Sequence, residues 1–259
     1  MQPLLFTVEF RRKMAKLPQR DRQEWLASLA VRLRSEPSPL VEQELREVAR
    51  GCRLPLVEAI QKQLGPFDSA QLKAILEVPR ERFVRAEDIE RSAEDVPLPL
   101  DDEGLATVSA PHAYLLSFRL LELAAGDSLI ELGTGTGYGA ALAAFIVGPQ
   151  GHVSTFEIDP DLARTAARLL ADQPNVSSHH HDAVTSAPAW GDARKVTVTF
   201  AVAALPAEWL AAVPEGGRLV APVGAREGDQ RLVLVRREQG RLVETDHGAV
   251  RYVRNRSSR

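Results

Sequence analysis

The sequence predicts an α/β protein with a doubly wound, mostly parallel sheet, preceded by an N-terminal helical region. From residue 109 onward, short strand-like runs alternate with helical runs, which is the pattern of strands joined by crossover helices. The glycine-rich stretch ELGTGTG, residues 131–137, follows an apolar run and opens the next helix. Before residue 77, by contrast, the apolar residues recur only at helical spacing.

The N-terminal region is expected to contain only helices. One helix is predicted over residues 20–34, and a second starts at Ser38 and Pro39, a favoured pair for an N-cap and first helical position, and ends at Gly51. Two shorter helices are predicted over residues 55–64 and 69–76. We expect residues 1–67 to form an accessory helical region and residues 68–259 to form the main domain.

The main domain is expected to begin, after a loop, with a helix capped by Ser109 and ending near Gly126. Strands and helices then alternate, and two antiparallel strands close the chain. The predicted strands are 128–132, 152–158, 175–181, 195–201, 217–223, 230–238 and 241–253, and the helices between them are 138–148, 159–172 and 206–213.

The composition excludes several classes of protein. Hydrophobic residues make up 44% and charged residues 26% of the 259 residues, and the net charge is −3, so we expect no nucleic-acid partner. No apolar run is long enough for a signal peptide or a membrane span, so we expect a cytoplasmic protein without a membrane partner. Cys52 is the only cysteine and is expected to be a small buried residue.

A metal site is not expected either. His179, His180 and His181 are consecutive residues of a predicted strand, and consecutive strand side chains point to opposite faces, so the three imidazoles cannot converge on one ion.

The glycine stretch requires a ligand that comes close to the backbone. Gly135, Gly137 and Ala140 satisfy the dinucleotide pattern G-x-G-x-x-G/A, which is weak evidence when it stands alone. Three acidic residues, each near the end of one of the first three predicted strands, favour a different ligand. They are Glu131 for a cationic amino-acid end, Glu157 for the hydroxyls of a ribose, and Asp182 for the amine of an adenine. S-adenosylmethionine combines these three parts.

At these residues the sequence resembles a known family. ELGTGTG together with Glu157 and Asp182 resembles the Rossmann-like class I S-adenosylmethionine-dependent methyltransferases. The stretch ATVSAPHAYLLSFRLLEL, residues 106–123, more narrowly resembles the protein-L-isoaspartate(D-aspartate) O-methyltransferases, whose signature there is T-[IV]-S-x-P. AILEVPRERFV, EGGRLVAPVG and the pattern that starts at Gln230 are also similar, so the resemblance covers residues 68–253.

The resemblance implies a carboxyl methyltransferase that repairs L-isoaspartyl residues in proteins or peptides and releases S-adenosylhomocysteine. It implies Ser109 as the active-site residue and a cofactor site without a metal. The cofactor-binding residues that we expect are Ala106, Thr107, Val108, Ser109, Glu131, Gly133, Thr134, Gly135, Gly137, Glu157, Asp182 and Ala183.

The predicted chemistry needs few catalytic groups. A carboxylate with a pKa of about 4 is ionised at neutral pH, so methyl transfer to it requires alignment rather than a general base. Amine-methylating enzymes often carry an Asn/Asp-Pro-Pro-Tyr loop after the fourth strand, where this chain reads FAVAALP. Oxygen is therefore the expected acceptor.

Two departures from the family leave the substrate open. Arg194 and the segment 201–204 replace the family's aspartate and Ala-Ala-Ala-Pro loop, and Arg254 and Asn255 follow Val253 where the family has Val-Pro-Leu. The alternatives are a methyltransferase for one dedicated peptide or small acid, and a non-catalytic cofactor-binding protein. The arginine-rich tail, RYVRNRSSR, is either a solvated end or a lid that meets the substrate carboxylate. No sequence feature specifies an oligomeric state.

Overall fold

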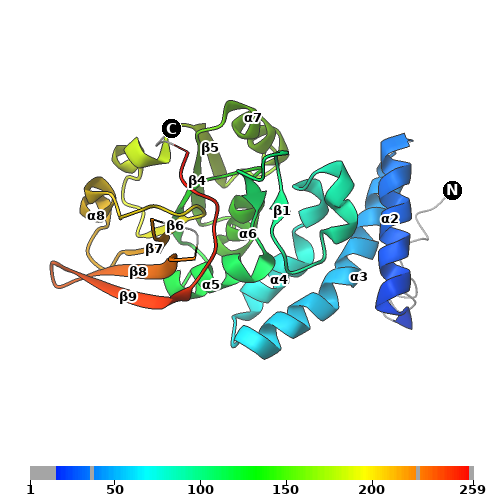
Figure 1. Cartoon of the computed structure of the whole chain (residues 1–259), viewed down its shortest axis with the longest axis horizontal. Coiled ribbons are helices and arrows are strands. Elements are labelled where there is room, and N and C mark those ends of the chain that lie inside the picture. Colours follow the sequence, from blue (N-terminus) through cyan, green and yellow to red (C-terminus); the bar gives the residue numbers. More distant parts are fainter. Residues whose placement is uncertain (1–15, 36–37, 226–227, 257–259) are drawn as a thin grey trace.

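A seven-stranded sheet forms the centre of the chain in the computed structural model, which describes residues 16–35, 38–225 and 228–256 (Figure 1). The strand order is β5-β4-β3-β6-β7-β8-β9. Neighbouring strands from β5 to β7 run parallel, whereas β8 and β9 are antiparallel. The strands are β3 Ser128–Leu132, β4 His152–Glu157, β5 Val176–His180, β6 Lys195–Val198, β7 Arg218–Val223, β8 Arg231–Glu238 and β9 Arg241–Ala249. The doubly wound, mostly parallel sheet is thus confirmed.

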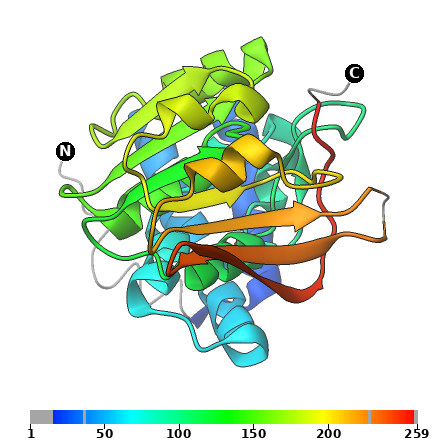
Figure 2. The same ribbon diagram turned by 90° about the vertical axis from the view of Figure 1, so that its left-hand side faces the viewer.

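Both faces of the sheet are covered. One face packs against α4 (Ser69–Glu77), α5 (Pro111–Leu121), α6 (Tyr138–Val147) and α7 (Pro160–Leu169). The other face packs against the short helices η4 (Ala183–Thr185), η5 (Ala187–Ala189) and α8 (Ala207–Ala212). The hairpin of β8 and β9 forms one edge of the sheet and β5 the other (Figure 2).

The strand order places a crevice between β3 and β6. The chain runs from β3 outward to β4 and β5, then returns to add β6 on the opposite side of β3. Leu132 is in register with both Phe156 of β4 and Val198 of β6, so the segments that follow these three strands emerge together. Ligands of open α/β sheets bind at such a switch point.

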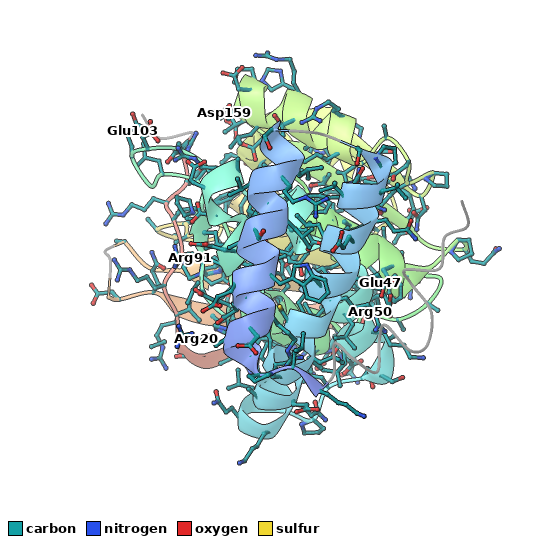
Figure 3. All side chains as sticks on the ribbon, turned by 90° about the vertical axis from the view of Figure 1, so that its right-hand side faces the viewer. Arg20, Glu47, Arg50, Arg91, Glu103 and Asp159 are labelled. Atoms are coloured by element: carbon teal, nitrogen blue, oxygen red, sulfur yellow. The ribbon has the colours of Figure 1, made fainter. Side chains whose placement is uncertain are left out.

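The N-terminal helices form a small core of their own. Helix α2 (Gln19–Ser35) lies across α3 (Pro39–Leu64) on one side of the molecule, and polar side chains such as that of Arg20 point outward (Figure 3). Leu26 and Leu29 of α2 pack with Leu45 and Val48 of α3, and with Ile89 from η3 (Ala86–Arg91). As expected, the Ser38 hydroxyl caps α3 by accepting a hydrogen bond from the backbone N–H of Val41, at 3.2 Å.

Helix α3 continues past Gly51, so the predicted end there was wrong. Pro55 lies inside the helix and has no N–H to donate to the Gly51 carbonyl. Arg22 of α2 fills this gap, because its Nη1 donates to the Gly51 oxygen at 2.7 Å. Tertiary packing therefore joins the predicted helices 38–51 and 55–64 into one.

The long α3 belongs to two cores. Its first half packs against α2, whereas Leu56, Val57 and Ile60 pack with α4 and α6 in the core beside the sheet. Cys52, at the transition, is fully buried, and burial raises the pKa of its thiol to about 11. The boundary at residue 67 stays a prediction, but the packing changes within α3, before that residue.

Helix α5 is shorter than expected, and Ser109 does not occupy its N-cap. The helix spans Pro111–Leu121 with Ala110 as the N-cap residue. The carboxylate of Asp95, 17 residues upstream, accepts the free backbone N–H of His112 at 3.0 Å. At the other end Glu122 adopts a left-handed conformation with φ 54° and terminates the helix.

The segment between α4 and α5 contains only short elements. They are η2 (Arg80–Arg82), η3, and the two-residue strands β1 (Leu98–Pro99) and β2 (Thr107–Val108), which pair antiparallel. Among the residues that the structure describes, no helix is long and apolar enough to cross a membrane.

Candidate functional site

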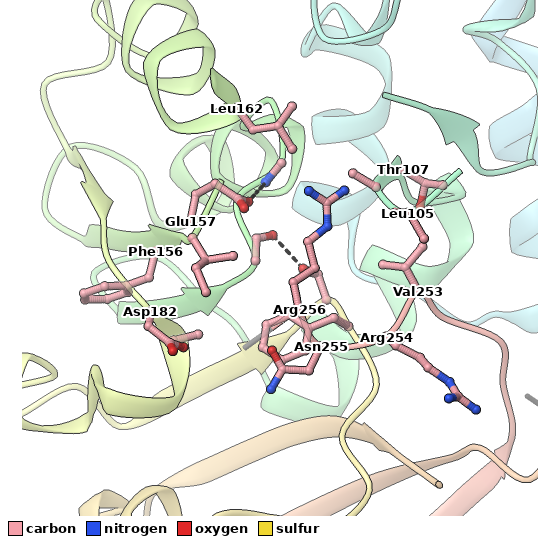
Figure 4. Close-up of a pocket in the computed structure, with 17 residues that line it drawn as sticks. Leu105, Thr107, Phe156, Glu157, Leu162, Asp182, Val253, Arg254, Asn255 and Arg256 are labelled. Atoms are coloured by element: carbon pink, nitrogen blue, oxygen red, sulfur yellow. Dashed lines mark hydrogen bonds between the residues drawn. The ribbon is translucent and has the colours of Figure 1, made fainter. Parts of the chain in front are cut away.

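A pocket opens at the carboxyl ends of β3, β4, β5 and β6 (Figure 4). In Figure 4, Glu157 and Leu162 lie on one side of the pocket, Leu105 and Thr107 on the other, and residues 253–256 run between them. The lining residues are Leu105, Ala106, Thr107, Gly133, Gly135, Phe156, Glu157, Ile158, Leu162, Asp182, Ala183, Thr199, Phe200, Val253, Arg254, Asn255 and Arg256.

The glycine loop presents its backbone to this pocket. Gly133 and Gly137 have φ of 93° and 101°, a region that residues with a Cβ rarely adopt. The loop threonines point inward: Thr134 hydrogen-bonds to Thr155 at 2.6 Å, and the Thr136 hydroxyl donates to the Phe83 carbonyl at 2.6 Å. Side chains therefore anchor the loop from below and leave its upper surface to a ligand.

Glu157 is one of the two predicted acidic residues that line the pocket, together with Asp182. One carboxylate oxygen accepts the backbone N–H of Gly135 at 2.7 Å, and the other accepts that of Asp159 at 3.0 Å. Burial raises the pKa of Glu157, although these two hydrogen bonds oppose the shift. The carboxylate thus fixes the loop after β3 to the end of β4.

Glu131 lies beneath the glycine loop, outside the lining formed by the described residues. Its side chain points to the same face of the sheet as Leu129, toward α5 and α6, because strand side chains alternate. It is 1% exposed and accepts a hydrogen bond from the Thr155 hydroxyl at 2.7 Å. Burial raises its pKa to about 8, so it carries little negative charge at neutral pH.

Asp182 and Ala183 form the wall beyond β5. Asp182 follows the strand, and its carboxylate accepts the backbone N–H of Val184 at 2.9 Å. This hydrogen bond caps η4 and holds both residues against the pocket.

Residues 250–256, which we term the C-terminal strap, cross the mouth of the pocket. The backbone of Ala201 donates to Val253 at 2.7 Å and accepts from Asn255 at 3.0 Å, which ties the strap to the end of β6. The buried side chain of Gln230 donates to the Tyr252 carbonyl and accepts its N–H.

Arg256 fastens the end of the strap. Its guanidinium donates to Asp159 at 2.9 Å, after β4, and to Asp101 at 2.5 Å, in the loop before Thr107. Burial would raise the pKa of Asp159, but two backbone N–H groups and Arg256 outweigh it, so the pKa is lowered. The described part of the tail thus crosses the pocket instead of extending into solvent, and its contact with a substrate carboxylate stays a prediction.

A wider groove adjoins the pocket and contains Ser109. The pocket and the groove share Leu105, Thr107 and residues 253–256 in their linings. Only the groove is lined by Ser109, His112 and Leu116. The Ser109 N–H donates to the buried Tyr114 hydroxyl at 3.2 Å.

The structure brings together part of the predicted site. Residues that line the pocket as expected are Ala106, Thr107, Gly133, Gly135, Glu157, Asp182 and Ala183. Predicted residues that lie outside the lining, within the described ranges, are Val108, Ser109, Glu131, Thr134 and Gly137. Thr199 and Phe200 were missed, although they directly follow β6, the strand across the switch point. Among the described residues, no three His, Cys, Asp or Glu side chains are grouped to hold a metal ion.

Comparison with known families agrees with this geometry. Residues 55–258 match the family model of protein-L-isoaspartate(D-aspartate) O-methyltransferase. The chain belongs to this family. The match of the family model begins inside α3, near the residue where that helix passes from the α2 core to the sheet core.

Several members of the protein-L-isoaspartate O-methyltransferase family are similar over most of their length. The chain is 42% identical to a protein of Geotalea uraniireducens named protein-L-isoaspartate O-methyltransferase 1, over 67% of this chain and 78% of that protein. It is 33% identical to the Methanosarcina mazei protein-L-isoaspartate O-methyltransferase, over 80% of this chain and 86% of that protein.

Solved structures give the same family and fold. A protein-L-isoaspartate O-methyltransferase structure superposes with a TM-score of 0.70 at 27% identity, covering 78% of this chain and 65% of the other. A Plasmodium falciparum structure described as a complex with S-adenosyl-L-homocysteine has a TM-score of 0.68 at 20% identity, covering 79% of this chain and 98% of the other, and supports the fold alone.

Proposed function

We propose that this protein transfers a methyl group from S-adenosylmethionine to the free carboxylate of L-isoaspartyl residues in proteins or peptides. The observation that carries the proposal is the shared wall of Leu105 and Thr107 between the pocket and the groove. A cofactor in the pocket and a peptide in the groove would meet at Thr107, two residues from Ser109. The family to which the chain belongs has this activity in its name.

The residues that line the pocket support the cofactor assignment through their chemistry. Gly133 lies so close to Thr199 and Phe200 that a Cβ would collide with both side chains, so only glycine lets the loop approach the segment after β6. Glu157 and Asp182 both line the pocket, and in this proposal Glu157 accepts the ribose hydroxyls and Asp182 the adenine amine. S-adenosylmethionine supplies an activated methyl group, and the chain's own residues have to align the acceptor and exclude water.

The groove suits an acceptor that is already ionised. A carboxylate has a pKa of about 4 and needs no general base at neutral pH. Orientation is then the main requirement, and it can contribute roughly 7–11 kcal/mol to lowering a barrier. Ser109 lies just before α5, and its hydroxyl can donate a hydrogen bond to a carboxylate in the groove.

A dedicated peptide substrate is the second candidate. The groove is lined by Arg251 and Arg254 of the C-terminal strap, where the sequence departs from the family pattern. These cations would favour an acidic peptide.

We expect Glu157→Ala to weaken binding of S-adenosylhomocysteine by roughly 1.5–3 kcal/mol, the usual contribution of a hydrogen bond to a charged group. Isothermal titration calorimetry measures the change. Asp161→Ala is the matched control, because Asp161 is an exposed acid in the first turn of α7. Equal affinity in both variants, or a thermal shift with NAD and none with S-adenosylhomocysteine, would contradict the assignment.

We expect Arg256→Gln to accelerate release of S-adenosylhomocysteine about two- to tenfold, because the strap then loses its two ion pairs, each a modest contribution where water has access. Release from the native protein should also be faster at 0.5 M than at 0.05 M salt. The Debye length, ~10 Å at 0.1 M, shortens as the salt concentration rises, which weakens the two ion pairs. Stopped-flow displacement measures both rates. Arg254→Gln is the control, because Arg254 lines the same pocket but donates to the Ala225 carbonyl. The same acceleration in both variants would exclude a latch specific to Arg256.

The proposed function is tested with labelled S-adenosylmethionine, an isoaspartyl peptide and its aspartyl twin. We expect alkali-labile methyl esters on the first peptide and few on the second, and a rate at least about tenfold lower in Ser109→Ala with cofactor affinity retained, as for a lost hydrogen bond to a charged group. Equal labelling of both peptides would favour the second candidate. An alkali-stable methyl group would exclude carboxyl transfer, and bound cofactor without any labelling would favour a non-catalytic protein.

A further inference from the structure

His112 projects into the substrate groove and is held by a carboxylate. Its ring Nδ1 lies 2.9 Å from Oδ1 of Asp95, and the same oxygen accepts the His112 backbone N–H at 3.0 Å. The His112 side chain is 37% exposed and lines the groove together with Ser109. The two residues are three positions apart at the start of α5.

Arg80 fixes the pair relative to Ser109. This arginine is fully buried, and its guanidinium donates to the carbonyls of Glu94 and Val96 at 2.8 and 2.7 Å. It also donates to the Ser109 carbonyl at 3.2 Å. One rigid group thus holds the backbone on both sides of Asp95 and the backbone of Ser109.

The hydrogen bond determines which ring nitrogen faces the groove. Burial alone would raise the pKa of Asp95, but hydrogen bonds from His112 and the charge of Arg80 outweigh it and lower the pKa. An ionised Asp95 can only accept, so Nδ1 carries a hydrogen. Nε2, on the opposite side of the ring, has no hydrogen-bond partner within residues 16–35, 38–225 and 228–256.

Capping of α5 does not account for the ring contact. The backbone N–H of His112 already satisfies the capping role, and a residue of any type would supply it. The second hydrogen bond, between the ring Nδ1 and Asp95, only fixes the orientation of the His112 ring. It leaves Nε2 as the unpartnered nitrogen, among the described residues, of a side chain that lines the groove together with Ser109.

We propose that His112, oriented by Asp95, is the second side chain that binds the acceptor carboxylate, beside Ser109. This inference rests on the proposed function and specifies how the substrate is recognised. With a hydrogen on each ring nitrogen, the ring donates one charge-assisted hydrogen bond to Asp95 and a second to the acceptor carboxylate. Asp95 is a positioning residue, and His112 contacts the substrate.

The test measures recognition of the carboxylate without turnover. Fluorescence anisotropy reports binding of a labelled isoaspartyl peptide to the full chain saturated with S-adenosylhomocysteine. A second peptide carries an amide in place of the isoaspartyl α-carboxylate. We expect the native protein to prefer the carboxylate peptide by roughly 10- to 100-fold, the range for charge-assisted hydrogen bonds. His112→Ala should lose most of this preference.

Conservative and control variants separate recognition from folding. His112→Gln can still donate from its amide and should retain an intermediate preference, and so should Asp95→Asn, which keeps an oxygen to cap α5. His247→Gln, on β9, should match the native protein, because His247 pairs only with Thr245 among the described contacts.

A native preference that persists in His112→Ala overturns the inference, and so does an equal loss of affinity for both peptides, which indicates a structural role. If the native protein methylates isoaspartyl peptides but binds both probes equally, the inference fails and the proposed function stands. If it neither binds nor methylates the isoaspartyl peptide, both fail.

Discussion

Replacing Glu81 by alanine should cost about 3–5 kcal/mol of the free energy of unfolding, the usual result of breaking a buried ion pair. Glu81 lies in η2, and its carboxylate accepts from Arg53 of α3 at 2.6 Å; the two side chains are 1% and 2% exposed. Arg53 also donates to the Leu76 carbonyl at 2.9 Å. Without Glu81, the positive charge of Arg53 stays buried and keeps only the neutral Leu76 carbonyl as a partner. Urea unfolding at neutral pH measures the loss.

The double replacement Arg53→Met and Glu81→Leu distinguishes the ion pair from simple packing. Removing both charges should recover most of the stability, because apolar residues of similar volume often replace buried pairs without loss. Glu42→Ala is the control, since Glu42 pairs with Arg46 on the surface of α3, where such pairs contribute about 0.3–0.5 kcal/mol. A loss in Glu81→Ala as small as in Glu42→Ala would contradict this account.

The parts of the site that the sequence could predict depend on local geometry. Gly133, Gly135 and Glu157 directly follow or end strands, and the carboxyl ends of parallel strands meet at one edge of the sheet. Knowing where each strand ends is therefore enough to place these residues together. Thr199 and Phe200 follow the same rule and could have been included.

The parts that the sequence left open or did not predict depend on contacts between distant segments. The C-terminal strap reaches the pocket through Ala201 and Gln230, and Arg256 pairs with Asp101, 155 residues earlier. The cap of α5 comes from Asp95 rather than the adjacent Ser109. Local capping preferences did not predict a carboxylate 17 residues away.

Glu131 is a predicted cofactor contact that does not line the pocket. Its place at the end of β3 suggested contact with a cationic ligand. The alternation of strand side chains, however, puts it on the face of Leu129, toward α5 and α6. A direct contact between Glu131 and the cofactor stays a prediction. The burial of the Glu131 side chain has two consequences that can be measured.

We expect Glu131→Gln to remove a pH-dependent loss of stability. The ordinary pKa of 4.5 applies in the unfolded chain, whereas burial raises the pKa to about 8 in the folded protein. Between these values the folded state holds a proton that the unfolded state has released, so this group lowers stability as pH rises and the loss is complete above pH 8. From pH 5.5 to 8 the loss is on the order of 3 kcal/mol, at 1.36 kcal/mol per pH unit.

A glutamine at position 131 stays neutral throughout this range and can still accept the hydrogen bond from Thr155. Urea unfolding at pH 5.5 and pH 8 should therefore show a much smaller difference in Glu131→Gln than in the native protein, while exposed Glu42→Gln keeps the native difference. Because a protonated Glu131 supplies no charge at neutral pH, the same variant should bind S-adenosylhomocysteine within about threefold of native affinity, well under the loss expected of a charged hydrogen bond. An unchanged pH dependence would refute the buried neutral acid. A loss of affinity as large as in Glu157→Ala would instead restore Glu131 as an ionised group that the cofactor contacts.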